Sequence, residues 1–167
     1  MRPVPTRTLE RAALYAAALL LCVTPLGAQF IPATPLPQAL MSHTAVKLDG
    51  HVYVAGGISD TGGLKGQGGY LNNVYYCAQM NPDGSLGAWQ VASPMPDLLG
   101  LSMHASVEKN GFIYALGGAN LFGARETVYY SRANEDGTLA AWSTTTPMPA
   151  KLMAHAAAEH GGRIYVM

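Results

Sequence analysis

The sequence predicts an all-β protein assembled from repeated four-stranded units. A pattern of landmark residues occurs twice and begins a third time within the 167 residues. Short apolar runs separated by turn residues fill each copy, and this arrangement is typical of strands. No stretch after residue 40 keeps a helical apolar period for more than about two turns. Together these observations favour a repeat architecture made of strands alone.

Each copy of the repeat opens with a histidine and carries the same landmarks in the same order. The histidines are His43, His104 and His155, and a glycine pair follows the first two by thirteen residues. Both tryptophans of the chain belong to the pattern, each six residues after an aspartate. The landmarks are Gly56-Gly57, Tyr75-Tyr76, Asp83-Gly84, Trp89 and Pro94–Pro96 in the first copy, and Gly117-Gly118, Tyr129-Tyr130, Asp136-Gly137, Trp142 and Pro147–Pro149 in the second.

The two copies differ in length, and most of the difference lies in one place. The histidines are 61 and 51 residues apart, and seven of the ten extra residues fall between Ser59 and Asn73. Length changes of this kind are tolerated in loops on a fixed scaffold. We therefore expect a loop there and strands around it.

Four strands are predicted for each copy. In the first copy they are His43–Leu48, His51–Ala55, Asn73–Gln79 and Ala88–Ala92. Asp49-Gly50 and Asn110-Gly111 predict two-residue hairpins, because these residues accept the left-handed backbone of such turns. The second strands are continuously apolar and are expected to be buried on both faces; they are Val52–Ala55, Phe112–Leu116 and Ile164–Met167.

A propeller is the architecture that best buries the faces of such units, because its four-stranded blades pack radially around an axis. A glycine pair at the end of an inner strand gives backbone freedom and allows close approach of neighbouring backbone. Each tryptophan would pack one blade on the next. The prolines of Pro-Met-Pro have no amide hydrogen to donate within a sheet, so the motif cannot lie in a central strand. It marks an outer edge or the crossing to the next blade.

The glycine pair, the following tyrosine and the later tryptophan resemble the kelch repeat, whose blades have roughly 50 residues. The variant Asp-Gly-Ser/Thr-Leu-x-Ala-Trp looks like the kelch-type arrays of secreted bacterial proteins. The resemblance covers Pro37 to Met167, although the Arg that commonly precedes the first kelch strand is missing. It implies a kelch-type β-propeller with about two and a third blades and an incomplete ring. The expected blades are 37–96, 97–149 and the start of a third at 150–167.

The first 28 residues predict a secretory signal. Three arginines precede a twelve-residue apolar run, Ala12–Val23, and Pro25 and Ala28 follow it. The run is shorter than the roughly 20 residues that span a bilayer. We therefore expect a secreted protein or one of the periplasm or cell envelope, with no membrane segment after cleavage. A Pro-rich lead-in at 29–36 would precede the first blade.

The composition of the mature chain argues against nucleic-acid binding and against disulfides. After residue 28, seven Lys or Arg stand against nine Asp or Glu, so no basic stripe is expected. Cys77 is the only cysteine in this part, and it aligns with Ser131. We expect it to be a packed side chain.

The repeated histidines are the first candidates for chemistry. A ring of imidazoles could hold a metal, but repeat equivalence alone explains them, with each histidine capping or hydrogen-bonding a turn in its own blade. Equivalent atoms of adjacent blades are also too far apart to share a metal. Neither a Gly-x-Ser-x-Gly elbow nor a His-Glu-x-x-His motif occurs. We therefore predict no metal, no cofactor and no catalytic residue in this segment.

Two loops offer candidate binding residues. Lys65 and Gln67 lie in a Gly-rich loop between two strands, which lacks the following helix that phosphate binding needs. The loop could touch a ligand or be a solvated insertion. The equivalent loop of the second copy contains Asn120, Arg125 and Glu126. These residues could bind a sugar or a carboxylate, or could be ordinary loop residues.

These features predict an exported module that binds a protein or a carbohydrate. The resemblance leaves open part of a propeller enzyme, similar to sialic acid mutarotases or, less well, to galactose oxidases, and a truncated gene product. The remaining blades of the propeller would be needed to close its ring. Exposing one blade face of several hundred Å² would cost on the order of 10 kcal/mol. We therefore expect these residues, expressed alone, to self-associate or aggregate.

Overall fold

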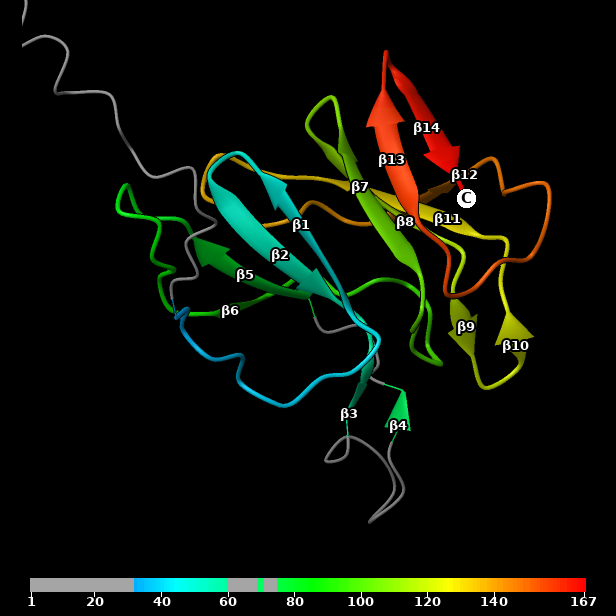
Figure 1. Cartoon of the computed structure of the whole chain (residues 1–167), viewed down its shortest axis with the longest axis horizontal. Coiled ribbons are helices and arrows are strands. Elements are labelled where there is room, and N and C mark those ends of the chain that lie inside the picture. The colour runs from blue at the N-terminus through cyan, green and yellow to red at the C-terminus, as the bar shows by residue number, and fades with distance from the viewer. Residues whose placement is uncertain (1–31, 60–68, 71–74) are drawn as a thin grey trace, which may run out of the picture. The chain divides into compact units, whose positions relative to one another are not determined.

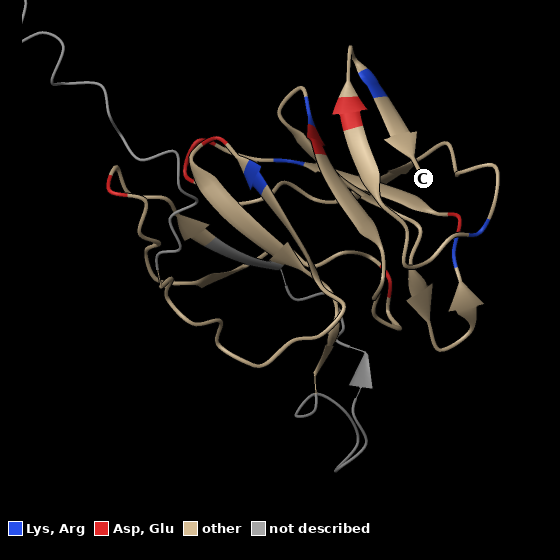
Figure 2. Cartoon of the chain, in the orientation of Figure 1, with Lys and Arg blue, Asp and Glu red and all other residues tan. Residues whose placement is uncertain are grey.

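The fold is all-β, as predicted. A computed structural model describes residues 32–59, 69–70 and 75–167, and within these ranges it contains strands and turns and no helix (Figure 1). Every pairing between the described strands is antiparallel. Acidic and basic positions are interspersed over the described sheets (Figure 2).

The described strands follow the repeat. The first sheet has the order β1 (Thr44–Leu48), β2 (His51–Ala55), β5 (Tyr75–Gln79) and β6 (Gln90–Ala92). The second sheet has the equivalent order β7 (Ala105–Lys109), β8 (Phe112–Leu116), β11 (Val128–Arg132) and β12 (Ser143–Thr145). A third hairpin joins β13 (Ala157–His160) to β14 (Arg163–Val166). Each copy of the repeat thus begins the same antiparallel meander.

The predicted two-residue hairpins are confirmed. Asp49 and Gly50 have φ of 46° and 74°, and Asn110 and Gly111 have φ of 54° and 77°. Two successive left-handed residues are what a type I′ turn requires, and its twist matches that of the flanking strands. Gly161 and Gly162 make the same turn in the third hairpin.

Several predicted boundaries were wrong by one or two residues. His43 precedes β1, and β6 begins at Gln90 instead of Ala88. The Gly87 amide still donates to Gln79 O of β5 at 2.8 Å, but Ala88 and Trp89 do not pair with β5. Asn73 lies outside the described residues.

Two short hairpins occupy regions where loops were predicted. They pair β3 (Ile58–Ser59) with β4 (Gly69–Tyr70), and β9 (Ala119–Asn120) with β10 (Gly123–Ala124). Each follows a glycine pair directly. Asn120 is therefore a strand residue and not a loop residue.

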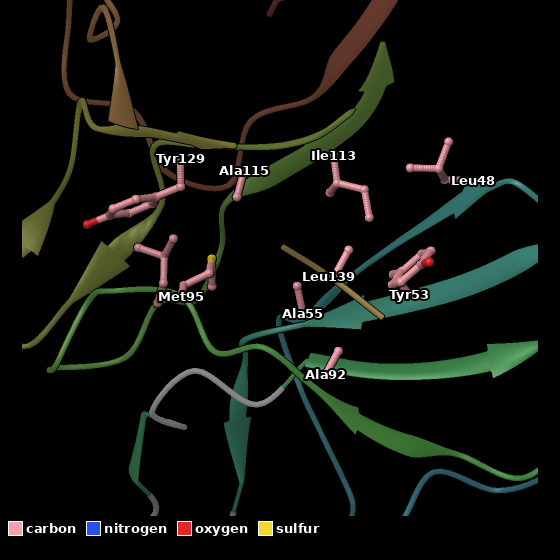
Figure 3. Close-up of a cluster of buried hydrophobic side chains, with 10 residues drawn as sticks. Leu48, Tyr53, Ala55, Ala92, Met95, Ile113, Ala115, Tyr129 and Leu139 are labelled. Carbon is pink, nitrogen blue, oxygen red and sulfur yellow. The ribbon is translucent and has the colours of Figure 1, made fainter. Parts of the chain in front are cut away.

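Successive sheets share one core. The first strands lie side by side, with β1 beside β7 and β7 beside β13 (Figure 1). A cluster of buried side chains from both sheets fills the space between the first and the second (Figure 3): Leu48, Tyr53, Ala55, Ala92, Met95, Leu101, Ile113, Ala115, Tyr129 and Leu139. The predicted burial of the second strands on both faces is confirmed for β2, where the neighbouring residues Tyr53 and Val54 are both buried. In β8 the face of Ile113 and Ala115 is buried, whereas Phe112 and Tyr114 on the other face are only half-buried. The prediction was wrong for Ile164–Met167, because Tyr165 and Met167 are exposed.

The glycine pairs explain the constant spacing from the histidines. Gly56 has a φ of 56°, and a Cβ there would overlap Leu101 O and the ring of His104 from the next copy. The second glycine of the pair, Gly57, lies against the Cβ of His43 from its own copy. Gly117 and Gly118 repeat these contacts with His155 and His104. The pair is therefore the site where two consecutive copies meet.

The tryptophans tie each sheet to the segment that precedes it. Trp142 Nε1 donates to Ser93 O at 2.9 Å, and Trp89 Nε1 donates to Thr34 O at 2.8 Å. The Thr34 and Ser93 hydroxyls donate in turn to Leu86 O and Leu139 O. Thr34-Pro35-Leu36-Pro37 thus holds the place before the first sheet that Ser93–Pro96 holds before the second. This Pro-x-Pro was not predicted as a copy of Pro-Met-Pro, because Leu36 stands in the place of the methionine.

Replacing Gly56 by Ala should destabilise the chain by roughly 2–4 kcal/mol, because the new Cβ adds overlap to the strain of a left-handed residue. Gly111→Ala is the matched control, since its φ is also positive but nothing lies within 4 Å of a Cβ there. It should cost only about 1 kcal/mol. Urea unfolding followed by tryptophan fluorescence measures both, and equal losses would contradict the proposed role of Gly56.

Candidate functional site

An open pocket with both polar and apolar walls lies where the β9–β10 hairpin meets the segment between β6 and β7. Its volume is about 430 Å³. Its walls come from four parts of the chain, namely Pro96 with the segment that follows it, β9, the residue after β10, and β11. The lining residues are Pro96, Asp97, Leu98, Leu99, Asn120, Arg125 and Tyr129.

Backbone hydrogen bonds hold these parts together. Ser102 and Ala119 exchange two backbone bonds of 2.9 and 2.7 Å, which fix β9 against the segment that carries Asp97. The Arg125 amide donates to Gly118 O at 2.8 Å, next to the glycine pair. The Asn120 Oδ1 accepts from the Phe122 amide at 2.9 Å and so shapes the hairpin turn. The pocket is therefore built on ordered backbone.

The carboxylate of Asp97 provides the hydrogen-bond acceptors of the pocket. Its side chain is only 6% exposed. Oδ1 accepts from the Leu99 amide at 3.1 Å, and the Tyr129 hydroxyl lies 3.4 Å from Oδ2, so this second oxygen is only weakly engaged. Burial, followed by the charge of Asp97, raises the pKa of Tyr129. The tyrosine therefore stays protonated at neutral pH and acts as a hydrogen-bond donor.

Two buried donors of the pocket residues have no partner among the described residues. They are Nδ2 of Asn120, whose side chain is 3% exposed, and Nε of Arg125. An unpaired buried donor costs about 1–3 kcal/mol. Both belong to residues that line the pocket, and unsatisfied buried groups of this kind are uncommon in folded proteins.

The structure brings together two of the four predicted binding residues. Asn120 and Arg125 line the same pocket, whereas Lys65 and Gln67 lie outside the described residues. Glu126 is exposed and is absent from the lining.

Sequence reasoning missed Asp97 and assigned Tyr129 to the sheet alone. A signal for Asp97 was present in the repeat. The residue after Pro-x-Pro is Gln38 before the first copy, Asp97 before the second and Ala150 before the third. A residue that changes at an otherwise equivalent position, beside fixed landmarks, is a candidate for binding. The side chains of Tyr75 and Cys77 lie outside the described residues.

The histidines serve the contact between copies. His104 is 3% exposed, and its Nε2 lies 2.8 Å from Thr44 Oγ1 of the preceding copy. The expectation that each histidine bonds a turn of its own blade was therefore wrong for His104, because the ring crosses the interface. Burial, then the charges of His155 and His43, lowers the pKa of His104 to about 4. Among the described residues, no three His, Cys, Asp or Glu side chains are grouped as a metal site.

Nothing in the described ranges forms a helix with the length and hydropathy needed to cross a membrane. No protein-family model matches the chain, and no curated protein matches it.

Acid should destabilise the contact between copies through His104. Its pKa is near 6.5 when unfolded and about 4 when folded, so the unfolded chain binds the proton first. The contribution of His104 to stability should be constant above pH 6.5, fall between pH 6.5 and 4, and change no further below that. The contribution of this histidine is about 3 kcal/mol at 1.36 kcal/mol per pH unit.

The His104→Gln variant is the control, because its amide can still reach Thr44 but does not titrate. Urea unfolding at a series of pH values should give a flatter profile for the variant than for the wild type. Identical profiles would contradict the assignment of this pH dependence to His104.

Proposed function

We propose that this chain is part of an exported kelch-type β-propeller that acts as a ligand-binding module. The observation that carries the binding function is the pocket with two unpaired buried donors, Asn120 Nδ2 and Arg125 Nε. Unsatisfied polar groups reduce folding stability, and a ligand that pairs them recovers that free energy. The pocket is therefore better suited to binding than to stabilising the fold.

The arrangement of the sheets supports the propeller part of the proposal. Two successive four-stranded meanders lie with their first strands side by side and share a core, as radially packed blades do. A pocket between the second sheet and the third hairpin is lined by apolar side chains that include Tyr114, Leu116 and Val166. In the preceding interface, Tyr129, Leu139 and Trp142 pack in the core between the sheets. Equivalent residues of a completed third blade would cover this apolar pocket.

The division between fixed and variable residues supports a binding role. The landmarks of the scaffold repeat, whereas Asp97 and Asn120 replace Gln38 and Ser59 of the first copy. Both residues stand in connections between strands of the sheets, where scaffolds of this kind carry their functions. Export rests on the signal-like residues 1–28, which lie outside the described residues.

Binding is tested by presenting arrays of glycans and of secreted proteins to the full chain, labelled at its N-terminal amine after export. We expect saturable binding that the Arg125→Gln variant weakens by about ten-fold, because a charge-assisted hydrogen bond is lost. Arg132→Gln is the matched control, since Arg132 is exposed and does not line the pocket. The absence of saturable binding on either array would contradict the proposed function.

A further inference from the structure

We infer that the ligand of this pocket is a neutral saccharide. The inference rests on the proposed binding function and concerns the chemical class of the ligand. It follows from three features of the pocket: the balance of donors and acceptors, the balance of charge, and an apolar rim.

The pocket offers hydrogen-bond donors and an acceptor together. Asn120 and Arg125 line the pocket, and each carries a buried donor without a described partner, Nδ2 and Nε. Asp97 contributes a carboxylate oxygen whose only described partner is the Tyr129 hydroxyl at 3.4 Å, a weak hydrogen bond. A sugar hydroxyl donates one hydrogen bond and accepts others. Vicinal hydroxyls can therefore serve both kinds of group at once.

The charges in the wall oppose each other. Arg125 alone would favour an anion, and Asp97 alone would favour a cation. Asp97 is 6% exposed, so its charge is poorly screened by water and would act strongly on an anionic ligand in the pocket. A ligand without net charge avoids repulsion by either residue. Neutral hydroxyls thus fit the wall better than carboxylate or phosphate groups.

Exposed apolar side chains occur at the pocket and in the turn that begins at Asn120. Leu98, which lines it, is 84% exposed, and Phe122 at the tip of the β9–β10 hairpin is 79% exposed. The Phe122 amide is held by Asn120 Oδ1, so the aromatic residue belongs to the same turn as the donor. One face of a pyranose carries C–H groups that pack on aromatic rings, while its edges carry hydroxyls. The volume of about 430 Å³ lies within the range of small-ligand sites.

The probes are methyl glycosides of glucose, galactose and mannose, each compared with its uronate, in which a carboxylate replaces the C6 hydroxymethyl group. Binding to the full chain is measured by saturation-transfer NMR and by competition between the two members of a pair. We expect at least one neutral glycoside to bind about ten-fold more tightly than its uronate, because Asp97 repels the carboxylate. A uronate that binds more tightly than its neutral partner would overturn the inference.

Asn120→Asp tests the site itself, because the change removes both amide donors and adds a second negative charge with little change in shape. We expect binding of the neutral glycoside to fall by about ten-fold or more. Asn110→Asp is the matched control, since Asp49 stands at the equivalent hairpin position in the first copy. If Asn120→Asp does not fold, Leu98→Ala replaces it: this exposed side chain lines the pocket and can be removed without loss of core, and binding should fall several-fold. Unchanged binding in the folded variant overturns the inference.

Different results would contradict the proposed binding function and the assignment of its ligand as a neutral saccharide. If the chain binds neither saccharides nor any protein on the arrays, the proposed binding function fails. If it binds a protein or an acidic glycan in an Arg125-dependent manner but no neutral glycoside, the binding function stands and only the assignment to neutral saccharides fails.

Discussion

The contact between each glycine pair and the histidine of the next copy is the constraint on which the structure depends. Gly56 and Gly117 have positive φ and no Cβ, so the backbone carbonyls of Leu101 and Leu152 and the rings of His104 and His155 can approach them closely. The Gly57 and Gly118 amides donate to the same two carbonyls at 2.9 and 2.8 Å. Steric fit and hydrogen bonding thus fix the distance between successive sheets.

The same contact positions the candidate site. The segment that carries Asp97 is held at one end by Met95, which is buried in the shared core, and at the other by His104, which lies against Gly56. The opposite wall begins at Gly118, whose carbonyl accepts from the Arg125 amide. Both walls of the pocket are therefore attached to glycine pairs.

Local patterns predicted the parts of the fold that depend on neighbours in sequence. Asp49-Gly50 predicted its hairpin because left-handed turns select these residues, and the apolar run Val52–Ala55 predicted a buried strand. The β9–β10 hairpin was missed because two-residue strands leave no periodic pattern. Asp97 was missed, and His104 was assigned to its own turn, because their partners are distant in sequence. Contacts of that kind depend on how sheets pack, which no short stretch of sequence encodes.

Native-state hydrogen exchange of the chain tests most directly whether successive copies form one cooperative structure. The shared core and the glycine–histidine contact predict that the central strands β2 and β8 open together. The amides of Val54 and Ala115 should then exchange with the same opening free energy, and Gly56→Ala should lower both equally. If β2 exchanges through a separate, lower-energy opening that leaves β8 protected, the contact between copies does not hold the fold together.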